Sequence, residues 1–104
     1  MTDSTLSTHV LDVTTGAPAV GATVELYQDG AMVGASTTDA DGRIASLGAE
    51  LAPGRYRLVF ETGTYFAARP SFLVRVSLDI DLPSGHSHVP LLVSPFSCVS
   101  YRGR

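Results

Sequence analysis

The sequence of 104 residues contains no lysine, no tryptophan and one cysteine, Cys98. Without lysine, the chain can neither form a lysine Schiff base nor use the phosphate-binding lysine of a P-loop. A single cysteine cannot form an intramolecular disulfide, so the fold must rest on side-chain packing, as in proteins of the reducing cytoplasm. A lone cysteine in an apolar stretch is more often a small core residue than a nucleophile, and we expect Cys98 to be buried.

Long apolar runs and clustered basic charge are also missing. No run approaches the roughly 20 residues that cross a bilayer, and the first residues lack the basic and apolar segments of a secretory signal, which favours a cytoplasmic protein. The net charge of −3 argues against a nucleic-acid partner. Hydrophobic residues make up 44% of the chain and charged residues 16%. This composition predicts one folded domain over residues 1–104.

Apolar residues recur with a period of two, which is typical of half-buried strands. The longest alternating segment, residues 72–82, predicts one strand with its even-numbered residues in the core. Shorter alternations cover residues 22–27 and 55–61, and Asp29-Gly30 predicts a hairpin turn. Thr62 as N-cap and Pro70 as stop signal delimit a short helix over residues 62–69. About seven or eight short strands and one helical turn predict an all-β, antiparallel β-sandwich.

The three histidines are the main candidates for chemistry. His9 lies in a predicted strand over residues 6–13, whereas His86 and His88 share a strand that follows Gly85. On a strand, two residues that are two positions apart point to the same face, roughly 6 to 7 Å apart. The three imidazoles could bind zinc, or they could act as general acids and bases in a metal-free hydrolase. Which histidine is the base stays open.

Arg43 is the best arginine candidate for stabilising negative charge. It follows the turn residues 39–42 (DADG), and its fork of donors suits a planar, oxygen-rich substrate. Four other arginines alternate with apolar residues and are expected on solvent-facing sides of strands: Arg55, Arg57, Arg69 and Arg75.

Two features near the C-terminus concern assembly. Residues 89–93 (VPLLV) are apolar on both faces of a predicted strand. One face can pack on the core, and we expect another subunit to cover the other, because a bare apolar strand promotes aggregation. A strand that runs to residues 97–104 would give Tyr101 and Arg102 a defined place.

Three motifs together resemble one family. They are residues 6–12 (LSTHVLD), residues 38–43 (TDADGR), and residues 86–95 (HSHVPLLVSP) with the terminal 101–103 (YRG). The chain resembles the 5-hydroxyisourate hydrolases, the enzymatic branch of the transthyretin-like proteins. The resemblance covers nearly the whole chain.

This resemblance implies a transthyretin-like sandwich of two four-stranded sheets with one short helix. It implies a homotetramer, a dimer of dimers, with the sites in a channel between dimers and with no metal or cofactor. The reaction would be hydrolysis of 5-hydroxyisourate, the product of urate oxidation, to 2-oxo-4-hydroxy-4-carboxy-5-ureidoimidazoline. The catalytic positions of the family fall on His9, Arg43 and His88, and its substrate-binding segment on Tyr101, Arg102 and Gly103.

Two positions depart from the family pattern. Arg104 stands where the family has a terminal serine, and Ser87 stands between the two histidines where an aromatic residue is usual. We expect the Ser87 side chain to point away from His86 and His88, so that packing changes more than chemistry. The non-catalytic branch, transthyretin itself, is the alternative: a carrier that binds a small ligand without turnover. It lacks these motifs, and this chain has no lysine to line the mouth of such a channel.

Overall fold

The structure is a computed structural model that describes residues 3–103, so Arg104 lies outside the described residues. Its elements in chain order are β1 (Ser4–Asp12), β2 (Ala17–Pro18), β3 (Thr23–Gln28), β4 (Ala31–Thr37), β5 (Arg43–Ile44), β6 (Gly54–Phe60), α1 (Thr62–Phe66), β7 (Val76–Leu82), β8 (Gly85–Ser94) and β9 (Ser97–Ser100).

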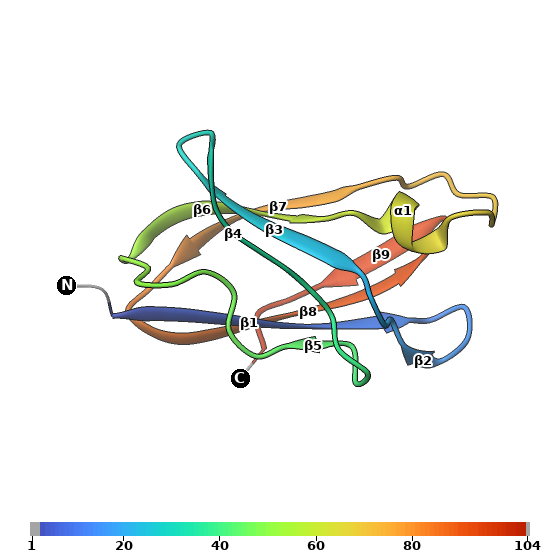
Figure 1. The fold of residues 1–104 in the computed structure, drawn as a ribbon, viewed down its shortest axis with the longest axis horizontal. Coiled ribbons are helices and arrows are strands. Elements are labelled where there is room, and N and C mark those ends of the chain that lie inside the picture. Colours follow the sequence, from blue (N-terminus) through green and yellow to red (C-terminus); the bar gives the residue numbers. More distant parts are fainter. Residues whose placement is uncertain (1–2, 104) are drawn as a thin grey trace.

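The strands form two stacked sheets (Figure 1). One sheet has the order β2-β1-β8-β9, with β5 also paired to β1, and the other has the order β4-β3-β6-β7. The predicted transthyretin-like sandwich with one short helix is confirmed. The first sheet has five strands, because β2 and β5 pair with different parts of β1. One pair, β1 with β8, is parallel rather than antiparallel.

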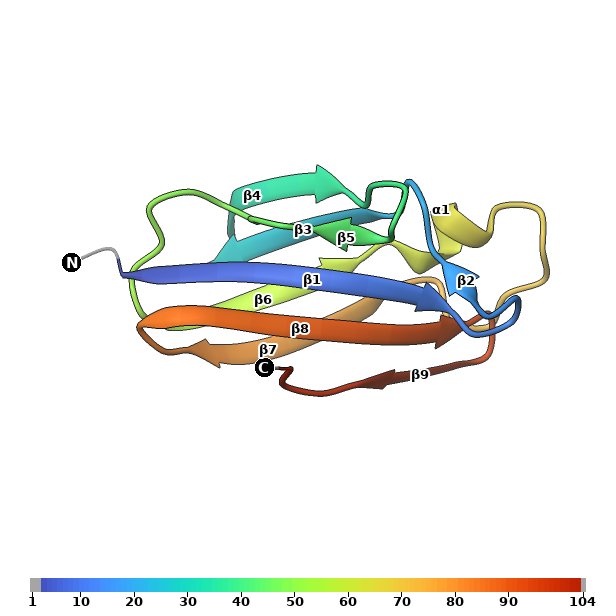
Figure 2. The same cartoon turned by 90° about the horizontal axis from the view of Figure 1, so that it is seen from below.

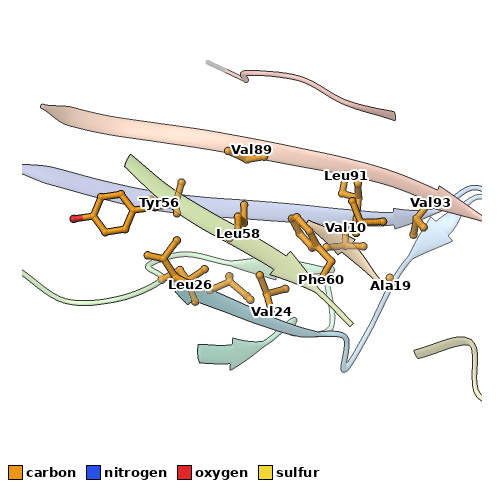
Figure 3. Close-up of a cluster of buried hydrophobic side chains, with 14 of the residues drawn as sticks. Val10, Ala19, Val24, Leu26, Tyr56, Leu58, Phe60, Val89, Leu91 and Val93 are labelled. Carbon is orange, nitrogen blue, oxygen red and sulfur yellow. The ribbon is translucent and has the colours of Figure 1, made fainter. Parts of the chain in front are cut away.

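The core lies between the two sheets, where alternate side chains of facing strands meet (Figure 3). The alternations predicted for residues 22–27 and 55–61 are confirmed, since Leu26 and Leu58 are fully buried. Burying one such side chain contributes about 1.5–3 kcal/mol to folding. From the first sheet, β1 and β8 contribute the facing residues Leu6, Val10, Val89, Leu91 and Val93.

The strand predicted over residues 72–82 is wrong in its first four residues. The observed strand β7 begins at Val76, and Phe72 and Val74 are 77% and 65% exposed. The partner strand β6 ends opposite Val76, so residues 72–75 have no neighbour in the sheet. The N–H groups of Phe72 and Leu73 donate instead to the carbonyl of Pro95, which makes this segment a connection between the sheets.

The predicted helix is present but shorter than residues 62–69. The helix α1 spans five residues and ends where Ala67 adopts a φ of 50°, which a helix does not permit. The N-cap is Glu61, and the hydroxyl of Thr62 donates to the carbonyl of Leu73. In the described part of the chain, no helix has the length and apolar character needed to cross a membrane.

The expectation that Cys98 is buried is wrong. Its side chain is exposed, because β9 is the outermost strand of its sheet and Ser97, Cys98 and Val99 all lie at that open edge.

Candidate active site

The pairing of three strands brings the predicted catalytic residues together on one face. The parallel ladder of β1 and β8 places Ser7 opposite His88, and the antiparallel pairing of β5 places Arg43 opposite His9. Residues directly opposite in a ladder point to the same face of the sheet. Because Val10 and Leu91 on the same strands face the core, His9, Arg43 and His88 point away from it. Figure 2 shows β5, β1, β8 and β9 side by side on this face.

The turn before β5 holds the backbone of Arg43 in place. The carboxylate of Asp39 accepts hydrogen bonds from the N–H groups of Asp41 (2.9 Å) and Arg43 (3.0 Å). These two hydrogen bonds lower the pKa of the Asp39 carboxyl. Gly42 has a φ of +74°, and a Cβ there would lie 2.5 Å from the carbonyl oxygen of Val10. The turn therefore packs directly on β1 and leaves the Arg43 side chain exposed beside His9.

A serine on β1 connects the two histidines of β8. The Ser7 hydroxyl lies 2.7 Å from Nδ1 of His88 and 2.8 Å from Nε2 of His86. The other ring nitrogen of His86, Nδ1, lies 2.7 Å from the Thr5 hydroxyl. The prediction that His86 and His88 share a face is therefore confirmed. Since Nδ1 of His88 is engaged by Ser7, Nε2 is the nitrogen that can meet a substrate or a water molecule.

His88 has the electrostatic character of a base. Burial lowers the pKa of His88, and the positive charges of Arg43, His9 and His86 lower it further. Each of these causes disfavours the imidazolium form. His88 is therefore mostly neutral at pH 7, the state in which an imidazole nitrogen accepts a proton.

The C-terminal segment continues past β9 and lies against His88. The N–H of Gly103 donates to the carbonyl of His88 at 2.7 Å, and a Cβ on Gly103 would lie 2.8 Å from Cδ2 of the imidazole. Any side chain at this position would require the imidazole ring or the backbone to shift. Tyr101 and Arg102, both exposed, line a cleft of about 330 Å³ between this segment and β7. The structure thus places Gly103 at His88, whereas Tyr101 and Arg102 line a cleft together with Ser87 and Val89, whose side chains point away from the face of His88. A substrate-binding role of Tyr101 and Arg102 stays a prediction.

Ser87 and the apolar run 89–93 behave largely as expected. The buried side chain of Ser87 points away from the face of His88, and its hydroxyl has no hydrogen-bond partner within residues 3–103. Within the run, Val89, Leu91 and Val93 face the core, whereas Pro90 and Leu92 lie on the outward face with the histidines. Leu92 is half-buried, and a covering subunit there stays a prediction.

The zinc hypothesis receives no support from the geometry. Across residues 3–103, no three side chains of histidine, cysteine, aspartate or glutamate are close enough together to form a metal-ligand group. The acid–base interpretation is the one that the arrangement of His9, Arg43 and His88 favours.

Sequence reasoning missed two groups of residues. Thr5 and Ser7 alternate with His9 along β1, and this period of two was a signal that they share the face of the histidines. Arg69 was expected in solvent, but it forms an ion pair with the buried Asp12. By contrast, Arg57 and Arg75 form exposed ion pairs, and Arg55 is exposed, as expected.

Comparison with known proteins identifies relatives over nearly the whole chain. The HIUase/Transthyretin family pattern matches residues 6–103. The 5-hydroxyisourate hydrolase of Pseudomonas aeruginosa is 41% identical over 94% of this chain and 90% of its own length. The uric acid degradation bifunctional protein TTL of Arabidopsis thaliana is 38% identical over 94% of this chain, which corresponds to 36% of that longer protein.

Solved structures show the same likeness. The 5-hydroxyisourate hydrolase of Klebsiella pneumoniae superimposes with a TM-score of 0.92 at 44% identity, covering 97% of this chain and 99% of its own. Transthyretin from Sparus aurata superimposes with a TM-score of 0.84 at 26% identity, covering 94% of this chain and 95% of its own. The fold, the histidine and arginine motifs and these relatives together show that the chain belongs to the HIUase/transthyretin family.

Proposed function

We propose that this protein hydrolyses 5-hydroxyisourate to 2-oxo-4-hydroxy-4-carboxy-5-ureidoimidazoline in urate degradation. Relatives at 39–43% identity are named 5-hydroxyisourate hydrolases, which supports the substrate, and the name of a relative at 38% identity supports a role in urate degradation. The observation that carries the proposal is the strand register, which gathers His9, Arg43 and His88 on one outward face. The exposed free thiol of Cys98 favours a reducing compartment, and we propose the cytoplasm.

In the proposed mechanism, Nε2 of neutral His88 takes a proton from water as the water attacks the carbonyl carbon of the cyclic amide. The new C–O bond places negative charge on the carbonyl oxygen, which the Arg43 guanidinium stabilises; such a donor contributes roughly 3 kcal/mol in other enzymes. The C–N bond then breaks, and the leaving nitrogen takes the proton from His88. The product carboxyl group ionises. His9, opposite Arg43 on the neighbouring strand, orients the substrate.

We propose that the site is completed by other copies of the chain. On the outward face of the first sheet, half-buried Leu92 lies opposite Val99, which is 59% exposed, close to the row of histidines. A second copy that packs there would cover this apolar surface and enclose the substrate. The family resemblance implies a homotetramer, so light scattering should give a mass about four times that of one chain. A fully active monomer would contradict the site between subunits.

The test of the function uses 5-hydroxyisourate generated in situ from urate. The protein should accelerate the loss of substrate absorbance at micromolar concentration. His9→Asn, Arg43→Ala and His88→Asn should each lower kcat/KM by about 100-fold or more. Arg55→Ala, which removes an exposed arginine from the other sheet, is the matched control and should have no effect. Near-normal rates in the three variants would show that the site lies elsewhere.

Two further outcomes separate the alternatives. Dialysis against a chelator should leave the rate unchanged, and activity restored only by zinc would revive a metal site. The fold is also shared with transthyretin from Sparus aurata, so a carrier without turnover is the second candidate. Equilibrium binding of an aromatic ligand together with unaltered decay of 5-hydroxyisourate would support that candidate.

A further inference from the structure

Four side chains form one continuous hydrogen-bonded row across β1 and β8. The row runs from Thr5 to His86, from His86 to Ser7, and from Ser7 to His88, with distances of 2.7, 2.8 and 2.7 Å. Its outer end is exposed, since Thr5 and His86 both face solvent. Its inner end is protected, since Ser7 is 8% exposed and His88 is half-buried. The row therefore connects the proposed base with bulk water.

The hydrogens of this row can be assigned by counting donors. If Nε2 of His88 is to accept a proton, the ring must carry its hydrogen on Nδ1, and this N–H donates to the Ser7 hydroxyl oxygen. The single hydroxyl hydrogen of Ser7 then donates to Nε2 of His86. His86 in turn carries its hydrogen on Nδ1 and donates to Thr5. All donors point away from His88, and every contact in the row is satisfied.

A cation on His88 has an unfavourable environment. Among residues 3–103, the groups whose charge acts on His88 are His9 on β1, Arg43 on β5 and His86 on β8, and none of these three is negative. His86 differs from His88 because water surrounds its exposed ring and can solvate a positive charge. Moving the positive charge from His88 to His86 therefore carries it from a half-buried ring to an exposed one.

We propose that Ser7 and His86 act as a proton relay that moves the positive charge formed at His88 out to solvent during catalysis. This inference rests on the proposed hydrolase function. As Nε2 of His88 gains a proton from water, its Nδ1 proton passes to the Ser7 oxygen, and the Ser7 hydroxyl proton passes to Nε2 of His86. His86 then holds the positive charge. When the leaving nitrogen takes the proton from Nε2 of His88, the two transfers along the row reverse. Ser7, His86 and His88 then return to their starting protonation states, and the proton taken from water ends on the leaving nitrogen.

The variant His86→Gln distinguishes a proton relay from a role in which His86 and Ser7 only hold the His88 ring in place. A glutamine side chain can still accept the hydrogen bond from Ser7, so it preserves the orientation of His88, but it cannot carry a proton. Ser7→Ala removes the connection altogether. Ser94→Ala is the matched control, because Ser94 lies on the same strand and, within residues 3–103, its hydroxyl bonds only to the neighbouring Ser97 and Phe96.

The experiment measures kcat and KM for these variants with 5-hydroxyisourate. His86→Gln and Ser7→Ala should each lower kcat by about 10-fold or more and leave KM within about twofold. The double variant should be no slower than the slower single variant, because both changes break one route. Ser94→Ala should match the wild type. A normal kcat in His86→Gln, a loss confined to KM, or losses that multiply in the double variant would overturn the relay.

A second measurement does not depend on turnover. Nitrogen NMR of the histidine rings at neutral pH should show His88 protonated at Nδ1 in the wild type, and this preference should disappear in Ser7→Ala. His88 protonated at Nε2 in the wild type would overturn the relay even if the enzyme is active. If the tautomer is as expected but 5-hydroxyisourate decays at its uncatalysed rate, the proposed function fails while the hydrogen-bonded row stands. His86→Gln alters only an exposed side chain, so it keeps the test valid if Ser7→Ala does not fold.

Discussion

Asp12 carries a buried carboxylate whose removal should destabilise the fold. Its side chain is only 2% exposed, at the end of β1. One carboxylate oxygen accepts the N–H of Thr14 at 3.0 Å, and the other accepts the Tyr65 hydroxyl at 3.1 Å and the Arg69 guanidinium at 3.0 Å. The carboxylate therefore joins β1 of the first sheet to α1 and the segment that follows it. Asp12→Ala removes all three connections at once.

The magnitude follows from the exposure of the partners. Removing one member of a fully buried ion pair costs about 3–5 kcal/mol, because the other charge is left buried without a partner. The Arg69 side chain is 41% exposed and can regain water, which reduces this cost. Tyr65 and Thr14 each lose a hydrogen bond to a charged acceptor. We expect Asp12→Ala to lower the free energy of unfolding by about 2–3 kcal/mol.

Urea unfolding followed by circular dichroism measures this change. The matched control is Asp79→Ala, which breaks an ion pair with Arg57 whose side chains are 73% and 59% exposed. An exposed pair of this kind contributes less than about 1 kcal/mol. If Asp12→Ala and Asp79→Ala lower the free energy of unfolding equally, burial and the three hydrogen bonds of Asp12 do not have the role assigned here.

The interactions of the Asp12 carboxylate also predict that the free energy of unfolding depends on pH. Burial raises the pKa of Asp12, but the hydrogen bonds from Arg69, Thr14 and Tyr65 outweigh it and lower the pKa overall. A carboxyl with a lower pKa in the folded state stabilises the fold fully above its ordinary pKa and loses this contribution as pH falls through the folded value. The difference in stability between the wild type and Asp12→Ala should therefore be constant near pH 7 and shrink below about pH 4.

Three other predictions concern the site and its surroundings. Because the pKa of His88 is lowered, kcat/KM should fall with decreasing pH only below the ordinary histidine value of 6.5. Arg43→Ala removes a positive charge near His88, so it should shift this acid limb of the pH–rate profile to higher pH. Gly103→Ala should lower kcat/KM by about 10-fold or more in steady-state assays, because its Cβ would displace the imidazole ring of His88. Ser87→Ala should raise the free energy of unfolding by about 1 kcal/mol in urea, because it removes a buried hydroxyl that has no partner within the described residues.

Strand faces could be predicted from the sequence because a period of two reports burial directly. Val24 and Leu26 alternate with polar neighbours, and both are fully buried in β3. The hairpin at Asp29-Gly30 was also predictable, since both residues adopt positive φ there, at 51° and 81°. In each case the local sequence carries the information, because the favourable free energy comes from the residues themselves.

Errors arose where a distant partner decides the outcome. Residues 72–75 alternate as well as β7 does, but β6 ends at Phe60 and offers them no ladder. Cys98 lies in an apolar stretch, but the edge position of β9 leaves it exposed. Arg69 alternates with apolar residues, yet its partner Asp12 is 57 positions away. A local pattern records the preference of a residue for burial, not whether another strand or charge is present to satisfy it.

In the candidate site, too, the residue types could be predicted from the sequence but their contacts could not. The parallel pairing of β1 with β8 explains this difference. The motifs identify His9, Arg43 and His88, but they do not reveal what each ring contacts. In this ladder Ser7 lies opposite His88, and it reaches the rings of both His86 and His88. A slip of one residue would turn the Ser7 side chain toward the core and leave both rings without their shared partner. The chemistry of His88 therefore depends on a register between segments about 80 positions apart, which no local pattern in either segment specifies.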